Sequence, residues 1–209
     1  GKPLKTAGAM DSIDDPMKEE LALRVTDLNV GSTAAAGKLA FFKEALAKRQ
    51  SEGLRTTIYS CTGHQPGNFS LCAPVENYWT IINAAKMGTA GFLRWAYDAW
   101  VEDPLRDTTH QWFEPGDCFL IYPSEKDAEE KAAQSSVRLE KMAQGVRDVN
   151  TLMQIKEELP DFTEKAAAVY DRVTTTALSS RQFLDAERRK ALSAEMGDFR
   201  KGLEELTEE

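Results

Sequence analysis

Apolar positions in the first part of the chain alternate between short β-branched or aromatic runs and longer stretches with helical spacing. The short runs predict strands and the longer stretches predict helices, in the order strand 4–10, helix 34–52, strand 55–61, helix 75–87, strand 92–97 and strand 118–122. The stretch 21–30 is ambiguous, and a second strand around Asp27 fits it. Strands that alternate with helices imply parallel pairing through right-handed crossovers.

The pattern changes beyond Pro123, where glycine becomes rare and Ala, Glu, Lys, Arg and Leu dominate. A charged loop over 124–134 precedes three predicted helices at 135–159, 161–174 and 180–206, the second of them capped by Asp161. The apolar positions of the third helix are spaced for one face: Phe183, Leu184, Leu192, Met196, Phe199, Leu203 and Leu206. We therefore divide the chain into an α/β part at 1–123 and a helical C-terminal region of three helices at 124–209, which packs on it.

The α/β part has too few strand–helix units for a closed eight-stranded barrel. We expect an α/β fold that forms the C-terminal portion of a (β/α)₈ barrel of the TIM type, followed by a helical tail. A half-barrel leaves two sheet edges open, and proteins normally cover or pair such edges. The expected cover is the N-terminal half of the barrel, which this sequence does not contain, or a second copy of the chain.

Composition narrows the range of partners. The 209 residues carry a formal net charge of −8, so no basic surface for nucleic acid or an anionic membrane is expected. No run approaches the roughly 18 apolar residues of a membrane-spanning helix. Three cysteines favour free thiols over a disulfide framework, and two histidines without a Cys-x-x-Cys argue against zinc. We expect neither a metal nor another cofactor.

The densest group of chemically useful side chains follows the predicted strand at 92–97. Ligands bind beyond the carboxyl ends of parallel strands, and Tyr97, Asp98 and Trp100 fall at such an end. An aromatic face suits the apolar C–H face of a sugar, and a carboxylate suits its hydroxyls. The pattern favours a sugar site for these three residues, whereas Phe92 and Trp95 fit the core better.

A second group, Tyr59, Cys61, His64 and Asn68, follows the strand at 55–61. A binding loop and a plain surface loop, in which Asn68 bonds to its own backbone, fit this group equally well. A cysteine nucleophile would need a base and a lowered thiol pKa, and the sequence indicates neither.

Acidic residues after the first strand are typical of a solvated loop and helix start: Asp11, Asp14, Asp15, Glu19 and Glu20. A glycosidase normally needs two carboxyls, or one acid that assists a substrate acetamido group. No adjacent Asp-Glu stands at a predicted strand end, so we assign no catalytic residue.

Several runs between Thr56 and Leu152 resemble glycoside hydrolase family 123 in their order and spacing. These runs are 57–61, 66–69, 91–100, 103–108, 116–123 and 136–140, which read TIYSC, PGNF, GFLRWAYDAW, DPLRDT, GDCFLIYP and SVRLE. The stretch from Thr56 to Leu152 covers a little under half of the chain, and the last two predicted helices carry no such resemblance.

The resemblance implies a (β/α)₈ catalytic barrel that acts on β-linked N-acetylhexosaminides, chiefly N-acetylgalactosamine, with the substrate's acetamido oxygen as nucleophile. It also implies a catalytic Asp-Glu pair upstream of the matched region, and an extracellular or periplasmic location. What carries over to this chain is the sugar-binding wall: Tyr59, Asn68, Trp95, Tyr97 and Trp100. His64 and Asp98 join it as substrate-binding candidates from their own positions after the predicted strands. Two other interpretations stay open, a non-catalytic carbohydrate-binding half-barrel and an interaction module that recruits a partner through its helices.

Overall fold

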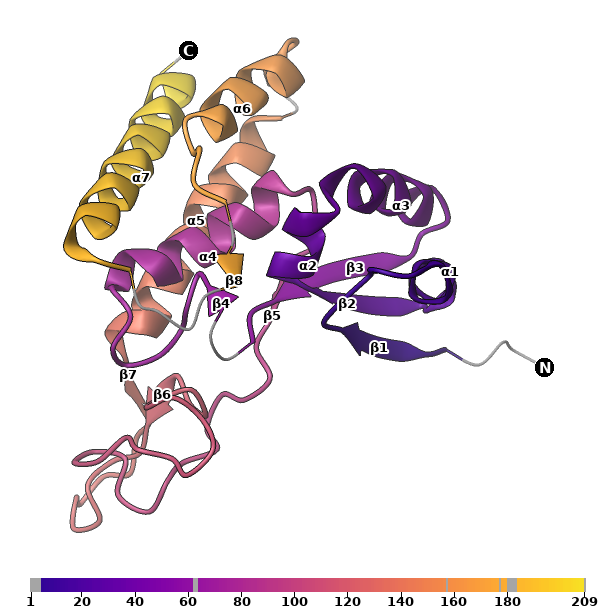
Figure 1. The fold of residues 1–209 in the computed structure, drawn as a ribbon. Coiled ribbons are helices and arrows are strands. Elements are labelled where there is room, and N and C mark those ends of the chain that lie inside the picture. Colours follow the sequence, from indigo (N-terminus) through magenta and orange to yellow (C-terminus); the bar gives the residue numbers. More distant parts are fainter. Residues whose placement is uncertain (1–4, 62–63, 157, 177, 180–183, 209) are drawn as a thin grey trace.

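A four-stranded parallel sheet lies at the N-terminal end of the protein. The computed structural model describes residues 5–61, 64–156, 158–176, 178–179 and 184–208. Its parallel strands are β1 (Ala7–Met10), β2 (Asp27–Gly31), β3 (Arg55–Tyr59) and β5 (Phe92–Leu93), and they neighbour one another in chain order. The strands run toward the middle of the molecule, so their carboxyl ends face the segment around β4 (Figure 1). The predicted parallel order is confirmed.

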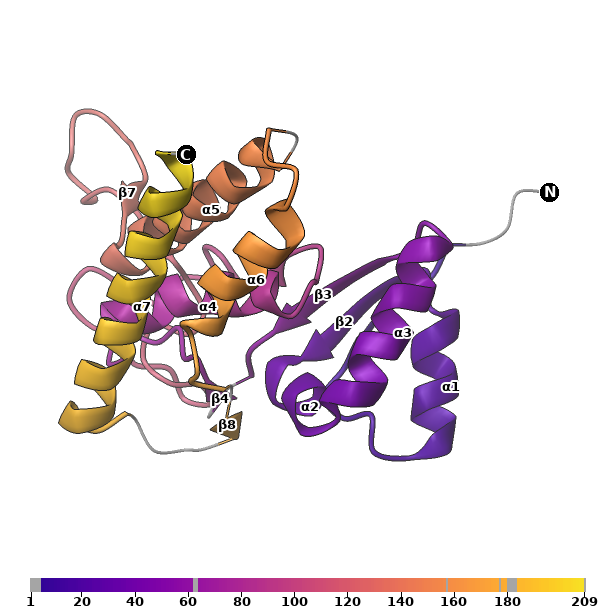
Figure 2. The same ribbon diagram turned by 90° about the horizontal axis from the view of Figure 1, so that it is seen from above.

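Helices cover one face of this sheet (Figure 2). They are α1 (Pro16–Arg24), α2 (Ser32–Gly37), α3 (Leu39–Ser51) and α4 (Pro74–Lys86). Met10, Val30 and Ile58 stand side by side in the register and pack against Phe42 of α3 and Met87, which directly follows α4.

The opposite face of the sheet carries Ala9, Asn29 and Thr57, which are also register neighbours. Ala9 is exposed and the other two are half-buried. The Thr57 hydroxyl bonds to Asn29, whose amide in turn donates to the carbonyl of Gly8 at 3.3 Å. In the described part of the chain, β1 and β5 are edge strands. The sheet therefore has one covered face, one uncovered polar face and two edges.

Two predicted strands are corrected by the structure. Only Phe92 and Leu93 of the stretch 92–97 are in a strand, and 118–122 does not join the parallel sheet. Instead the chain folds back on itself: the amide of Leu120 donates to the carbonyl of Tyr97 at 2.8 Å. Ile121–Tyr122 (β6) then pairs antiparallel with Gln134–Ser135 (β7). Residues 94–135 thus form one long loop. Its backbone groups bond partly to one another and partly to Ser70 and Arg138 outside the loop.

The ambiguous stretch 21–30 divides into two elements. Its first residues end α1, and its last ones form β2 from Asp27 onward. Asp15 begins α1 by accepting a hydrogen bond from the amide of Lys18. The helix predicted at 34–52 is present as α2 and α3, which meet at Lys38.

Three helices follow β7: α5 (Val137–Ile155), α6 (Phe162–Asp171) and α7 (Ala186–Thr207). They form a second core with α4, in which Trp79, Ile82 and Phe199 are fully buried. Gly145 of α5 lies so close to α4 that a Cβ there would approach Ile81 to 2.9 Å. The predicted helix start near Ser180, and Phe183, lie outside the described residues.

Helix capping in this region differs in part from the prediction. Asp161 precedes α6 but makes no side-chain capping bond, whereas Asp185 accepts from the amide of Arg188 at the start of α7. Between α6 and α7, β8 (Leu178–Ser179) pairs antiparallel with β4 (His64–Gln65). None of the described helices is both long and apolar enough to cross a membrane.

A buried arginine joins the helices to the sheet. The guanidinium of Arg49, 1% exposed, donates to the Thr56 hydroxyl and to the carbonyl oxygens of four residues: Ala22, Val25, Thr26 and Arg55. These carbonyls lie at the end of α1, at the entry to β2 and at the start of β3. A buried polar group without a partner is costly, so the guanidinium fixes all three segments at once.

We predict that Arg49→Met lowers the free energy of unfolding by about 3 kcal/mol, because four carbonyls lose their buried donor. Urea denaturation followed by circular dichroism measures the change. Arg24→Met is the matched control, since Arg24 and its partner Glu20 are exposed and their ion pair contributes little. Equal destabilisation by both substitutions would contradict the role of Arg49.

Candidate sugar-binding site

The carboxyl ends of the parallel strands gather polar side chains from separate parts of the chain. Asp11 follows β1, Thr33 lies in the first turn of α2 directly after β2, and Tyr59 ends β3. Trp95 stands two residues after β5. In parallel α/β folds this edge is where ligands bind.

His64 lies at the centre of the first group. Its Nδ1 accepts a hydrogen bond from the amide of Cys61 at 3.3 Å, and the Thr33 hydroxyl lies 3.4 Å from the same nitrogen. In the neutral ring the proton therefore lies on Nε2. Tyr59 and Cys61 are half-buried beside it. The loop after β3 is thus bonded to the helix that follows β2.

The protonation states of this group argue against nucleophilic catalysis by cysteine. Burial raises the pKa of the Cys61 thiol, and the nearby charge of Asp11 adds to the effect. Burial also raises the pKa of Tyr59. It lowers the pKa of His64, and the charge of Asp11 partly opposes this second shift. Near neutral pH the group therefore presents a phenol, a thiol and a neutral imidazole, which suit hydrogen bonds to hydroxyl and amide groups.

Asn68 lies inside the protein rather than on its surface. It is 1% exposed, and its amide nitrogen donates to Asn77 Oδ1 and Thr80 Oγ1 of α4, at 3.1 Å each. Its carbonyl accepts from Arg138 of α5 at 2.8 Å. Asn68 therefore attaches the loop that carries His64 to two helices. The prediction of a plain surface loop in which Asn68 bonds to its own backbone is wrong.

Trp95 belongs to a second group, at the start of the long loop. It was expected in the core but is 51% exposed, and its ring lies 4.8 Å from that of Phe113. Its indole N–H donates to Asp117 Oδ2 at 3.2 Å, and Asp117 is paired with Arg94 at 2.6 Å. Phe92, in contrast, packs against the core as predicted.

A buried ion pair fixes this aromatic surface. The side chains of Arg94 and Asp117 are 8% and 1% exposed. The charge of Asp117 also raises the pKa of Cys61, which lies at the other group. Asp117 therefore fixes Trp95 through a hydrogen bond, whereas it acts on the Cys61 thiol only through its charge.

Tyr97, Asp98 and Trp100 lie farther along the long loop, and all three are exposed. The indole N–H of Trp100 donates to the carbonyl of Ile121 at 2.9 Å, and Asp98 forms a β-bridge with Phe119. Among the described residues, no hydrogen bond or ring contact joins these side chains to Tyr59 or His64. The structure thus brings Tyr59, His64 and Trp95 to the strand ends, and places Tyr97, Asp98 and Trp100 on the adjoining loop.

A cavity of about 230 Å³ adjoins Trp100 and is lined by residues 100–106 and 123–126.

Sequence reasoning missed two members of the first group, Asp11 and Thr33. The position of Asp11 directly after a predicted strand could have indicated its place at the strand ends. No sequence pattern indicated the place of Thr33. The described residues hold no cluster of three or more His, Cys, Asp or Glu side chains suited to a metal. All three cysteines are free, as expected.

Comparison with known families gives a match over most of the chain. Residues 3–155, which include the sheet, both groups of side chains and α5, match the sequence model of the glycoside hydrolase 123 catalytic domain. The chain belongs to glycoside hydrolase family 123. The comparison with curated proteins gave no match.

A solved structure supports the family 123 assignment beyond the matched range. It is described as "a family 123 glycoside hydrolase from Clostridium perfringens", in a study of "glycolipid glycan hydrolysis". The two chains share 32% identity with a TM-score of 0.84, and the match covers 97% of this chain. It covers 35% of the other chain, so the present chain spans about a third of that protein. The similarity includes the C-terminal helices, where the sequence carried no recognisable motif.

We predict that Asp117→Asn destabilises the protein by about 3 kcal/mol, because Arg94 would keep a buried charge without its counter-charge. Trp95 loses its carboxylate acceptor, so the tryptophan fluorescence spectrum shifts as well. Chemical denaturation and emission spectra measure both effects. Asp103→Asn removes an exposed partner of Arg106 and serves as the control. An Asp117→Asn protein as stable as the control would contradict the proposed anchor.

Proposed function

We propose that this chain supplies the sugar-binding wall of a family 123 glycoside hydrolase that acts on β-linked N-acetylhexosaminides, chiefly N-acetylgalactosamine. The observation that carries the proposal is the position of Tyr59, His64 and Trp95 at the carboxyl ends of adjacent parallel strands. A half-exposed indole fits the C–H face of a pyranose, and the phenol and imidazole fit its hydroxyls or its acetamido group. Tyr97, Asp98 and Trp100 extend this wall along the loop.

Asn68 enters the proposal in a different role from the others. Because its side chain is bonded to α4 and buried, it shapes the loop and does not touch the sugar. The similar structure comes from a study of glycolipid glycan hydrolysis, which supports a glycan as the ligand proposed for this chain.

We further propose that the sheet is the C-terminal part of a (β/α)₈ barrel. Helices on one face only, strands in chain order and two edges are what a segment of such a barrel presents. The uncovered polar face with Asn29 and Thr57 would then face the barrel interior. The greater length of the matched structure favours the remaining barrel strands as the cover, with a second copy of the chain as the competing outcome.

The catalytic acids are proposed to lie outside these 209 residues, because the sequence contains no Asp-Glu dipeptide. The same observation favours a second candidate function, a half-barrel that binds carbohydrate without hydrolysis. Addition of the remaining barrel as a separate polypeptide distinguishes the two, since only a split enzyme would gain turnover.

We predict that Trp100→Ala weakens the binding of N-acetylgalactosamine about fivefold, because about 1 kcal/mol of aromatic contact is lost. Calorimetric titration measures the affinity. Met153→Ala on α5 removes an equally exposed apolar side chain far along the sequence, and it should leave the affinity unchanged. Unchanged affinity in Trp100→Ala would remove Trp100 from the site.

We also predict that the 209-residue chain alone does not hydrolyse nitrophenyl β-N-acetylgalactosaminide above background. The physical reason is the lack of an Asp-Glu pair that orients the acetamido group and protonates the leaving oxygen. Release of nitrophenol, followed by absorbance, is the measurement. Turnover that Asp98→Asn abolishes would overturn this prediction and assign catalysis to the chain itself.

A further inference from the structure

The segment between α6 and α7 reaches from the helical region to the loop that carries His64. We call residues 174–176 together with β8 the C-terminal strap. In β8, Ser179 is the register partner of His64 and Leu178 that of Gln65. Figure 1 shows β8 beside β4, at the point where the two cores approach each other. The backbone of β8, the far end of the strap, therefore pairs with the segment that carries His64.

A single carboxylate holds the other end of the strap. Glu195 of α7 accepts hydrogen bonds from the amide and hydroxyl of Thr174, at 3.1 and 2.7 Å. It also accepts from the amide and hydroxyl of Thr175, at 2.9 Å each. Four donors converge on one ionised group, and hydrogen bonds to charged groups are stronger than neutral ones.

The charge state of Glu195 agrees with this anchoring role. Burial alone would raise its pKa, but the hydrogen bonds from Thr175 and Thr174 outweigh that effect, and the pKa lies below its ordinary value. Glu195 is therefore ionised at neutral pH. The bonds strengthen the folded state above the ordinary pKa of a glutamate and are lost as the pH falls through the lowered value.

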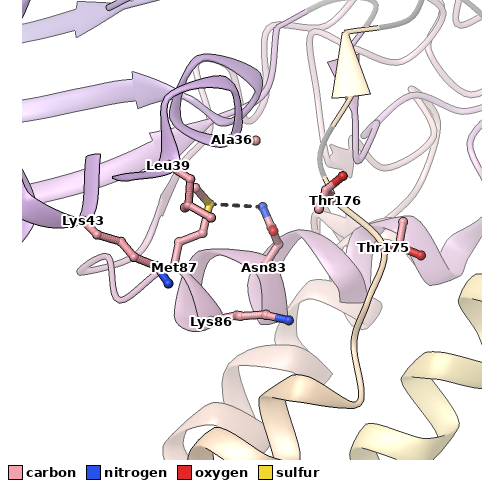
Figure 3. Close-up of a pocket in the computed structure, with 8 residues that line it drawn as sticks. All are labelled: Ala36, Leu39, Lys43, Asn83, Lys86, Met87, Thr175 and Thr176. Atoms are coloured by element: carbon pink, nitrogen blue, oxygen red, sulfur yellow. Dashed lines mark hydrogen bonds between the residues drawn. The ribbon is translucent and has the colours of Figure 1, made fainter. Parts of the chain in front are cut away.

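The part of the strap before β8 lies over a cavity. The cavity has a volume of about 100 Å³ and is lined by Thr175 and Thr176 on one side and by residues of α2, α3 and α4 on the other. Figure 3 shows the two threonines across from Met87, Leu39 and Asn83. A void of this kind forfeits van der Waals contact between its walls. The hydrogen bonds to Glu195 therefore hold Thr174 and Thr175 at the place where the cavity leaves packing contacts unmade.

We propose that Glu195 is a positioning residue that sets the place of the His64 imidazole through the C-terminal strap. The proposal rests on the proposed function in so far as His64 takes part in sugar binding. Glu195 itself is placed in α7 and acts only through the strap, while Thr33 and the amide of Cys61 contact the imidazole directly. The helical region would then help to position a residue of the site, in addition to packing against the α/β part.

Nuclear magnetic resonance of the imidazole nitrogens tests the proposal, because the chain has only two histidines. His110 lies in the long loop, where its Nδ1 accepts from the amides of Trp112 and Phe113, and it serves as an internal reference. Glu195→Ala removes all four acceptor bonds. Glu195→Gln keeps one acceptor oxygen and should restore part of the wild-type spectrum.

The matched control is Glu205→Gln on the same helix. It breaks the ion pair of Glu205 with Arg172, at 2.6 Å, without touching Thr174 or Thr175. We expect the His64 resonances to move in Glu195→Ala, to move less in Glu195→Gln and to stay in place in Glu205→Gln. His110 should not move in any of them. Movement of His64 in the control equal to that in Glu195→Ala, or no movement in either, would overturn the proposal.

A second variant covers the case in which Glu195→Ala does not fold. The double substitution Thr174→Val and Thr175→Val keeps the shape of the strap and removes both hydroxyl donors, and it should move His64 in the same direction. Titration of wild type with N-acetylgalactosamine then separates the two proposals. If the sugar leaves His64 unmoved while Glu195→Ala moves it, the proposed role of His64 fails and the positioning by Glu195 stands. If both move it, we expect Glu195→Ala to weaken sugar binding about fivefold, the effect of one lost hydrogen bond.

Discussion

Helix α4 is the element on which the rest of the structure depends, because it is buried on both sides. One side, with Ala84 and Met87, completes the core beneath the sheet. The other side, with Trp79 and Ile82, forms the core of the helical region. Such a helix cannot shift against one core without disturbing the other, since protein interiors are close-packed. The two regions of different composition are therefore coupled mechanically. The position of a site built on one region depends on the position of the other.

The candidate site uses this rigidity through buried polar groups. Asn68 bonds to α4, Arg138 of α5 reaches the carbonyls of Asn68 and Gly116, and Asp117 holds both Arg94 and Trp95. Each of these groups is costly to bury and therefore tolerates few alternative positions. Gly116 adds a further constraint, because its φ of +76° and the nearby Ser70 and Arg138 leave no room for a side chain. The long loop has little regular structure, yet it is anchored at defined points.

The sequence predicted most of the helices and the parallel strands correctly, but it did not predict the long loop at 94–135. Alternation of strand and helix patterns gave the parallel order correctly, because burial against helices imposes that pattern on each strand. The stretches 92–97 and 118–122 have the same apolar, aromatic character but mostly do not join the sheet. Their hydrogen bonds go to one another, as between Leu120 and Tyr97, and no local pattern records that choice. Trp95 was misplaced for a related reason: its exposure depends on Asp117, which stands 22 residues later.

What the sequence determined by itself was the content of strands and helices and the family resemblance, and it nominated the side chains proposed for a sugar site, because periodicity and motif spacing are local properties. The tertiary structure decided which of those side chains meet. It brought Thr33 to His64, placed Asn68 inside the protein, and paired β8 with β4 across more than a hundred residues. These outcomes follow from the close packing of α4 between two cores and from the need of each buried polar group for a partner. Both conditions are met only when distant segments come together.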